Sequence, residues 1–271
     1  MATLRAALPM YDYPPLAVAH QALLTAVVTH LHRHGHAHLP STLSRPSPLL
    51  EFWQSQRVLL SQTCEYPWLL SLQNHLEILA TPCYAAPHCE GPLYRSVVVT
   101  RSADPRSELA DFYNARVAIN DLTSNSGYNL LGAAVADLKA KNPFFKAALI
   151  SGSHHNSLNA IRANAADVAA IDCVSFAQLA RCALIDPDDF KIIGVTPPAG
   201  ALPWVCSKNL PDPLKADLVS ALSQILRDDR LTHTRQALLL NDFNFTPDRT
   251  VSLTRAASQR ALNVILCASL A

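Results

Sequence analysis

The sequence predicts an α/β protein made of two lobes. Along most of the 271 residues, predicted strands alternate with predicted helices. The strands show alternating apolar residues or many β-branched residues, and the helices show apolar residues three or four positions apart. This alternation is typical of mostly parallel sheets covered by helices. Hydrophobic residues make up 49% of the chain and charged residues 16%, so it can bury a core large enough for two lobes. Two breaks in the pattern, at 98–105 and 196–200, predict a discontinuous first lobe of residues 1–98 plus 198–271 and a second lobe of residues 99–197.

Up to the first break, the pattern predicts four strands and two helices. Residues 16–31 place apolar side chains three or four positions apart, as a helix does, and the proline-rich stretch at 32–48 is expected to be loop. The predicted strands are residues 4–10, 57–61, 76–80 and 94–100, with a short helix at 68–74.

After the first break, strand and helix signals alternate more regularly. The predicted strands are residues 116–120, 148–151, 168–173 and 191–196. The predicted helices begin at Ser126 and His155 and cover residues 176–184 and 213–227, and the tail from Leu231 is expected to mix helix and loop. Ligands of such folds bind at the carboxyl ends of strands, so the residues that follow the strands are the first candidates for a site.

The composition excludes several classes of function. The chain has 22 Lys and Arg against 21 Asp and Glu, a net charge of +1, so it is not a generally basic nucleic-acid binder and has no polybasic membrane footprint. None of its 7 glycines forms a GxG or a GxxxxGK[ST] motif, which excludes the glycine-rich dinucleotide and phosphate loops. We expect no cofactor and no nucleic acid.

The N-terminus shows no signal peptide. Arg5 and Pro9 interrupt the apolar start, and no apolar run reaches the length of a membrane span. We expect either a cytoplasmic chain or a mature chain whose leader has been removed.

Polar residues crowd three predicted strand ends. Ser124, Asn125 and Ser126 open a helix, where hydroxyls and unpaired backbone N–H groups suit an anion, although plain N-capping is the alternative. His154 opens the next helix and is expected either to face the same ligand or to be a solvated helix start. Asp172 ends an apolar strand, so it either orients a donor such as His154, faces the ligand, or caps the next helix.

Cysteine and histidine patterns leave two alternatives to a binding site. Cys64 with His154 would make a nucleophile and base, but most lone cysteines are small buried hydrophobes. The seven cysteines suit free thiols better than a disulfide framework, with a Cys83–Cys89 bridge as the alternative. Five histidines alternate between His30 and His38, but helical geometry would spread them, so we expect no functional metal site.

Several strand-end motifs follow one another in a definite order between about residues 4 and 210. The motifs are Leu8-Pro9-Met10-Tyr11-Asp12, Leu60-Ser61-Gln62-Thr63-Cys64-Glu65-Tyr66-Pro67, Tyr94-Arg95-Ser96-Val97-Val98-Val99, Ser124-Asn125-Ser126-Gly127-Tyr128, Gly152-Ser153-His154 with Ser157-Leu158, Ala166-Asp167-Val168-Ala169, Asp172-Cys173-Val174 and the proline-rich stretch at 197–203. In this order and spacing they resemble a known family, the PhnD-like phosphate/phosphite/phosphonate substrate-binding proteins of ABC transporters.

The resemblance implies a type II periplasmic-binding-protein fold, in which two α/β lobes close on a ligand held in the cleft between them. It implies a binding protein and not an enzyme, with a small phosphorus oxyanion (phosphate, phosphite or phosphonate) as ligand, an ABC-transporter permease as partner, and a monomer as its state. The implied contacts from the second lobe are Ser124, Asn125, Ser126 and His154, with Asp172 nearby, and those from the first lobe are Tyr11, Thr63 and Tyr94.

Three departures from the family pattern keep alternatives open. Asn125 stands where the family often has a hydroxyl residue, the stretch at 198–203 has no acid that would hold an aminoalkyl group, and an export signal is not visible. A cytoplasmic ligand sensor of the same fold, or a lobe that regulates a partner protein, therefore remains an alternative. A thiamine-pyrimidine-synthase-like enzyme is a further alternative, but the lysine it would need for pyridoxal phosphate is missing from the motifs.

Overall fold

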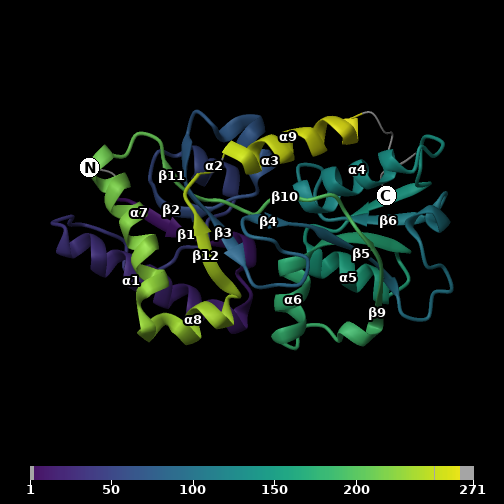
Figure 1. Ribbon diagram of the computed structural model, residues 1–271, viewed down its shortest axis with the longest axis horizontal. Helices are drawn as coiled ribbons and strands as arrows, with labels where there is room; N and C mark the ends of the chain where they lie inside the picture. Colours follow the sequence, from purple (N-terminus) through teal and green to yellow (C-terminus); the bar gives the residue numbers. More distant parts are fainter. Residues whose placement is uncertain (1–2, 247, 263–271) are drawn as a thin grey trace. The chain divides into compact units, whose positions relative to one another are not determined.

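The computed structural model describes residues 3–246 and 248–262, which fall into two compact units. The first unit comprises the chain up to Ala85 and Gly200–Arg249, and the second comprises Ala86–Ala199 and the chain from Thr250 onward. Each unit contains a five-stranded sheet covered by helices (Figure 1). The α/β class is therefore confirmed. None of the helices in the described residues is both long and apolar enough to cross a membrane.

The sheet of the first unit has the strand order β1-β2-β11-β3-β12. β1 is parallel to β2, β11 is antiparallel to both β2 and β3, and β12 is antiparallel to β3. The strands are β1 (Arg5–Ala7), β2 (Val58–Gln62), β3 (Leu76–Tyr84), β11 (Trp204–Ser207) and β12 (Leu240–Asn244).

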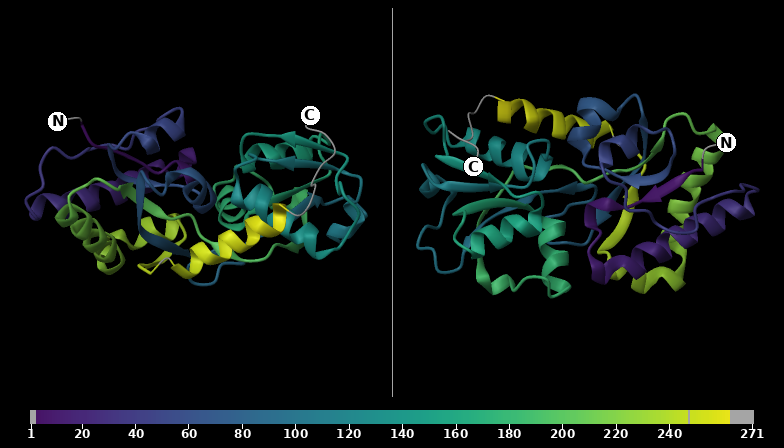
Figure 2. Two further views of the ribbon diagram at one scale, coloured as in Figure 1. Left: turned by 90° about the horizontal axis from the view of Figure 1, so that it is seen from above. Right: turned by 180° about the vertical axis from the view of Figure 1, so that it is seen from behind.

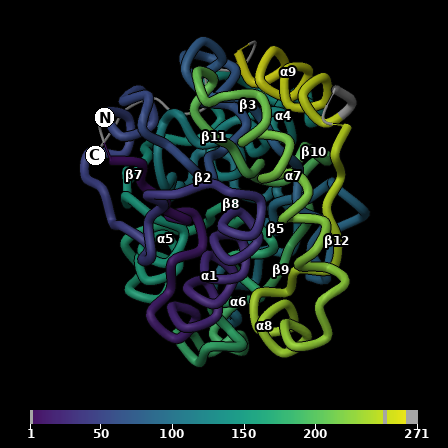
Figure 3. The backbone as a smooth tube through the Cα atoms, turned by 90° about the vertical axis from the view of Figure 1, so that its left-hand side faces the viewer, coloured from purple at the N-terminus to yellow at the C-terminus, as the bar shows by residue number. Residues whose placement is uncertain are grey.

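Helices of the first unit bury one apolar face each. Helix α1 (Ala17–Arg33) turns Leu23, Leu24, Val27 and Leu31 inward at helical spacing and packs against α7 (Asp212–Arg227), beside which it lies in Figures 1 and 3. The shorter helical segments are α2 (Leu49–Gln54), α3 (Glu65–Pro67) and α8 (Thr232–Ala237), with a π-turn at Trp68–Leu72 and 3₁₀ turns at Pro9–Tyr11, Pro14–Leu16 and Asp229–Leu231.

The hydrophobic spacing of the sequence did not predict helix α2. It spans less than two turns, which is too short to show a repeat. It nevertheless anchors a core cluster, because Phe52 and Trp53 are buried against Val58, Leu76 and Val205. Its burial is therefore a tertiary effect rather than a property of the local sequence.

The sheet of the second unit has the order β7-β6-β8-β5-β9. β6 is parallel to β7 and to β8, whereas β5 is antiparallel to β8 and to β9. The prediction of mostly parallel sheets is therefore wrong: both five-stranded sheets are mixed, because β5, β9, β11 and β12 run against their neighbours. The strands are β5 (Ser96–Arg101), β6 (Arg116–Ile119), β7 (Ala147–Ile150), β8 (Val168–Asp172) and β9 (Phe190–Val195).

Three helical segments of the second unit each follow one of the parallel strands, either at once or after a short loop. The segment after β6 starts as a π-turn at Asn125–Asn129 and continues as α4 (Leu130–Asp137). Helix α5 (His154–Arg162) follows β7, and α6 (Cys173–Arg181) follows β8. In Figure 1, α4 lies on one face of this sheet and α5 and α6 lie on the other. Short 3₁₀ turns occupy Leu109–Phe112 and Pro187–Asp189.

The division of the chain differs from the predicted boundaries of 1–98, 99–197 and 198–271. The first crossing falls at 85/86, before β4 (Leu93–Tyr94), which pairs with β10 (Ala199–Gly200) in a two-stranded sheet. Helix α9 (Asp248–Leu262) lies mostly in the second unit, because Ala261 packs closely on Gly132 and Arg260 forms an ion pair with Asp137. The right-hand view of Figure 2 shows the end of α9 beside α4.

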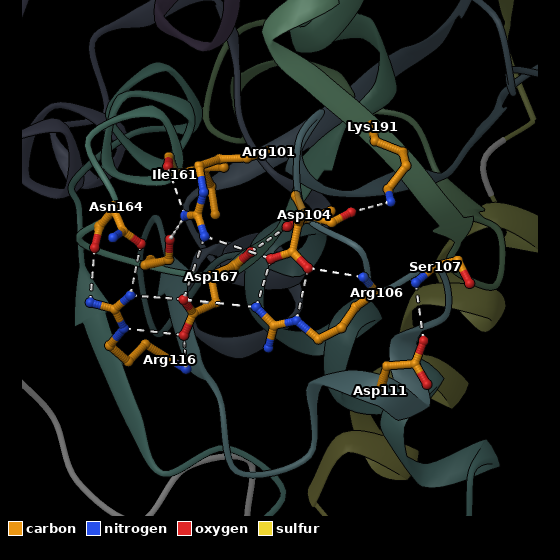
Figure 4. Close-up of polar contacts among 12 residues, drawn as sticks. Arg101, Asp104, Arg106, Ser107, Asp111, Arg116, Ile161, Asn164, Asp167 and Lys191 are labelled. Carbon is orange, nitrogen blue, oxygen red and sulfur yellow. Dashed lines mark hydrogen bonds and ion pairs between the residues drawn. The ribbon is translucent and has the colours of Figure 1, made fainter.

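An arginine–aspartate network fixes one edge of the second sheet (Figure 4). Arg116, at the start of β6, makes a two-pronged contact with Asp167, which precedes β8. Arg106 does the same with Asp104, with Nε–Oδ1 2.9 Å and Nη2–Oδ2 2.7 Å, and Arg101 lies 3.6 Å from Asp104 and 4.0 Å from Asp167. Planar guanidinium groups suit such paired contacts, so the network clamps the strand starts of β6 and β8 to the end of β5.

Replacing Arg106 by alanine should destabilise the fold in a pH-dependent way. The hydrogen bonds from Arg106 lower the pKa of the Asp104 carboxyl from 3.8 to about 2, against an opposing effect of burial. Because the native carboxylate holds its proton less tightly than the unfolded one, the pair stabilises the fold above about pH 4 and this stability is lost as the pH falls through about 2. We expect a loss of about 2 kcal/mol near pH 7 in urea unfolding, and little loss near pH 2.

Arg230 offers a matched control for this prediction. Arg230 contacts Asp228 in the same two-pronged geometry, two residues apart, but its side chain is 82% exposed. An exposed pair of this kind contributes little, so Arg230→Ala should change the unfolding free energy by less than about 1 kcal/mol. Equal losses in the two variants would contradict the role assigned to the buried Asp104.

Candidate functional site

The candidate site lies where the parallel strands of the second unit end. β6, β7 and β8 run in the same direction, so the residues that follow them meet at one edge of the sheet. β5 runs the other way and therefore brings its first residue, Ser96, to this edge, where Ser96 pairs with Asp172. The predicted residues Ser124, Asn125, Ser126, His154 and Asp172 all follow or end these strands.

Ser124 and Ser126 form a pair of hydroxyls at a helix start. Ser124 is the N-cap, and its Oγ accepts a hydrogen bond of 3.1 Å from the backbone N–H of Gly127. The Oγ atoms of Ser124 and Ser126 lie 3.3 Å apart, and both residues are buried. Ser96 donates its hydroxyl to the Ser126 carbonyl at 3.0 Å, which ties the helix start to β5. Capping therefore uses the Ser124 hydroxyl oxygen as an acceptor, while the hydroxyl protons of Ser124 and Ser126 can turn either toward their neighbours or toward a ligand.

His154 joins this pair from the next helix. Its Nε2 lies 2.7 Å from Ser126 Oγ. Burial lowers the pKa of the imidazole from 6.5 to about 4, so His154 is neutral at physiological pH. Its Nδ1 is buried without a hydrogen-bond partner. His154 thus acts in this site as a neutral donor and acceptor rather than as a cation.

Asn125 is held by Tyr94. Both residues are fully buried, and Asn125 Nδ2 donates to the Tyr94 hydroxyl at 3.2 Å. Asn125 Oδ1 is buried with no partner. The expectation that Tyr94 belongs to the opposite lobe is wrong, because the chain enters the second unit at Ala86, before β4. Tyr94 therefore positions Asn125 within one unit.

Asp172 caps a helix. Its carboxylate accepts a hydrogen bond of 2.8 Å from the backbone N–H of Ser175, which is the capping role considered for it from the sequence. The residue is buried at the end of β8, next to Ser96 in the strand pairing. A ligand contact for Asp172 stays a prediction.

Two predicted contacts, Tyr11 and Thr63, belong to the first unit. Both are buried at strand ends, and Thr63 donates its backbone N–H to Pro203 O at 3.2 Å. Tyr11 packs edge-on against Tyr84 with ring centres 5.4 Å apart, and the Tyr84 hydroxyl accepts a hydrogen bond of 2.9 Å from Gln62 Nε2. Their contact with a ligand stays a prediction.

Sequence reasoning missed several residues that shape the site. Asn120 directly follows β6, and its buried Oδ1 has no partner. The buried Asn129, at the end of the π-turn, also leaves Nδ2 without one. Gly127 fits against Asn120, since a Cβ there would lie 1.8 Å from Asn120 Oδ1. The Ser-Gly pair at 126–127 is the one sequence signal that pointed to this close approach.

The nucleophile and metal alternatives gain no support. Cys64 is partly exposed and belongs to the first unit, whereas His154 belongs to the second. His34 Nδ1 and His36 Nε2 instead contact the two oxygens of Asp217 at 2.9 Å and 2.7 Å. Across the described part of the chain, no group of three or more His, Cys, Asp or Glu side chains could hold a metal ion.

The chain matches, over residues 6–253, the family described as the ABC transporter, phosphonate, periplasmic substrate-binding protein. The match covers most of the chain, so the chain belongs to this family, and the family resemblance of its motifs is confirmed. Members of the family are the substrate-binding components of transporters and are not enzymes.

Solved structures show the same fold. PhnD1 from Prochlorococcus marinus in complex with methylphosphonate has a TM-score of 0.75 at 12% identity, covering 96% of this chain and 98% of that chain. A binding protein component of an ABC phosphonate transporter from Pseudomonas aeruginosa has a TM-score of 0.72 at 14% identity, covering 97% and 95%. XAC2383 from Xanthomonas citri, bound to ATP, has a TM-score of 0.72 at 14% identity, covering 97% and 98%. The type II periplasmic-binding-protein fold is thereby confirmed.

Adding a methyl group at position 127 should disturb the helix start. In Gly127→Ala the new Cβ would lie 1.8 Å from Asn120 Oδ1 and 2.9 Å from Asn120 Cγ, so either Asn120 or the π-turn must move. We expect Gly127→Ala to lower the unfolding free energy by about 1–3 kcal/mol in urea unfolding. The double variant with Asn120→Ala should recover much of that loss, whereas additive losses would show that the two residues do not meet as described.

Proposed function

We propose that this chain binds a small phosphorus oxyanion, phosphate, phosphite or phosphonate, and delivers it to an ABC-transporter permease. The observation that carries the proposal is the hydroxyl pair of Ser124 and Ser126 at the start of a helical segment, with a neutral His154 hydrogen-bonded to Ser126. Membership of the phosphonate-binding family supports the same ligand class.

Neutral donors are enough to hold such an anion. The first turn of the 125–137 segment has backbone N–H groups that no helical carbonyl can accept, and its dipole favours negative charge at this end. Among the described contacts, no lysine or arginine side chain bonds to Ser124, Ser126 or His154. The ligand is therefore held by oriented dipoles, which recognise the positions of its oxygens rather than its total charge.

The side-chain oxygen of Asn125, which has no hydrogen-bond partner, favours a ligand with a proton on one of its oxygens. Because Nδ2 is engaged by Tyr94, Asn125 presents Oδ1, which repels a bare anionic oxygen and accepts from a P–OH group. Phosphate monoesters and phosphonates lose their second proton near neutrality, at about pH 6 to 7, whereas sulfate carries none there. Asn125 thus selects phosphorus oxyanions over sulfate.

The other predicted residues take supporting roles in this proposal. Tyr94 fixes the orientation of Asn125, and Asp172 holds the first turn of α6 at the same sheet edge. Tyr11 and Thr63 are further ligand contacts that the family resemblance implies. Substituting Tyr11 by Phe and Thr63 by Val would test them without loss of volume.

Removing the Ser126 and His154 donors should weaken binding sharply. Hydrogen bonds to charged groups contribute about 1.5–3 kcal/mol each, so Ser126→Ala and His154→Ala should each raise the Kd for methylphosphonate by a factor of about 10 to 100. Isothermal titration calorimetry with methylphosphonate, phosphite and phosphate measures this. His155→Ala, one position along α5, is the matched control and should leave Kd unchanged; an unchanged Kd in the other two variants removes the proposed site.

The selection by Asn125 predicts a pH dependence with a definite sign. As the pH rises from about 6 to 9, the ligand loses its second proton and the affinity for methylphosphonate should fall, by at most about tenfold per pH unit. In the unliganded protein His154 is neutral across this range, because burial lowers its pKa to about 4, so its own ionisation in the free protein adds nothing to the slope. Sulfate should bind weakly throughout, and Asn125→Leu should reduce the preference for methylphosphonate over sulfate. Equal affinities for the two anions in the unaltered protein would contradict this selection.

A further inference from the structure

Two cysteines that are distant in the sequence lie together in the second unit. Cys89 Sγ and Cys173 Sγ are 3.5 Å apart, although 84 positions separate them. The described residues contain six cysteines, none of which forms a disulfide with another, and Cys267 lies outside the described residues. The sequence left a Cys83–Cys89 bridge as an alternative. In the structure, Cys89 instead contacts Cys173, which its spacing in the sequence does not predict.

The two thiols differ in how easily they are reached. Cys89 is partly exposed in the loop between β3 and β4, where Pro87, His88 and Glu90 face solvent. Cys173 is the first residue of α6, is 3% exposed, and donates its backbone N–H to Arg95 O at 3.0 Å. One sulfur is therefore accessible to a small oxidant and the other is protected behind it.

Different nucleophilic strength sets the order in which the thiols react. The contact with Cys89, burial, and the nearby Asp172 carboxylate all raise the pKa of the Cys173 thiol above its usual value. The thiolate is the reactive form, so Cys173 is a poor first nucleophile. An oxidant should therefore react first at the more exposed Cys89.

We propose that Cys89 and Cys173 are a disulfide site that ties the β3–β4 loop to the end of β8 and the start of α6. The two sulfurs must approach from 3.5 Å to about 2 Å. The loop can supply this movement, because the backbone hydrogen bonds between Ala86 and Leu93 are local: Cys89 donates to Ala86 O, and Glu90 and Leu93 bridge each other.

The reaction needs a disulfide oxidant, for which oxidised glutathione is the probe. The Cys89 thiolate attacks one glutathione sulfur, which forms a mixed disulfide and releases one glutathione thiolate. Cys173 then gives up its proton and attacks the Cys89 sulfur, releasing the second glutathione. Two protein thiols are oxidised, one glutathione disulfide is reduced, and two glutathione thiols result.

The cross-link would reinforce the sheet edge that carries the binding residues. Cys173 follows Asp172, which pairs with Ser96, and Ser96 in turn holds the Ser126 carbonyl. Closing a loop of 84 positions restricts the unfolded chain considerably, so the oxidised protein should unfold at a temperature higher by on the order of 10 °C. This inference does not depend on the identity of the ligand.

The test is to treat the full chain with oxidised glutathione, block the remaining thiols with iodoacetamide, digest it without reduction and analyse the peptides by mass spectrometry. We expect a peptide pair joined through Cys89 and Cys173, a loss of two free thiols, and a rise in Tm that dithiothreitol reverses. Cys89→Ser, at the partly exposed position, should abolish the joined pair and the rise in Tm. Cys182→Ser, which alters another partly exposed thiol, should preserve both.

Three results would overturn the proposal. The first is that Cys89 and Cys173 both remain unmodified after oxidation. The second is that glutathione stays on Cys89 and no bond to Cys173 forms. The third is that the Cys89 peptide is joined to Cys83. Because Cys89→Ser changes a loop residue, its folding can be verified by an unfolding transition equal to that of the reduced parent protein.

Discussion

The parallel pairing of β6 with β7 and β8 is the constraint on which the rest of the second unit depends. Parallel strands end at the same edge, and each end must pass into a connection, so Ser124, His154 and Asp172 meet although they are far apart in the chain. The hydrogen bond of 2.7 Å between Ser126 and His154 is a consequence of that register. The antiparallel β5 completes the edge by presenting Ser96 from the opposite direction.

The two edges of this sheet carry opposite kinds of polar chemistry. At one edge, charged side chains neutralise each other in the network of Arg101, Arg106 and Arg116 with Asp104 and Asp167. At the other, serine, asparagine and neutral histidine side chains bond to each other and to Tyr94, while Asn125 Oδ1 and His154 Nδ1 have no partner. Charged pairs therefore stabilise the end at which β6 and β8 begin, while the candidate site at the opposite end is built from neutral polar side chains.

Several of the buried polar atoms without partners lie together at the candidate site, and others lie elsewhere, at His20, His30, Thr81 and Trp204. Asn120 Oδ1, Asn125 Oδ1 and His154 Nδ1 are all in this condition around one helix start. Each such group costs about 1–3 kcal/mol of stability unless water or a ligand supplies its partner, so a ligand bound here would recover part of that energy. The same region holds the Cys89–Cys173 contact, which lies at the end of β8.

The sequence by itself determined the local structure and the chemical character of the site. Hydrophobic spacing was sufficient for α1 and α7, β-branched residues for β5, and the polar residues at 124–126 for a helix start, while the anion site expected there stays a prediction. Only the tertiary structure decided that Tyr94 holds Asn125, that Gly127 packs against Asn120, and that Cys89 meets Cys173. Spacing along a chain records whether a side chain is buried, but not which distant residue it is buried against, because strand order and direction set those partners.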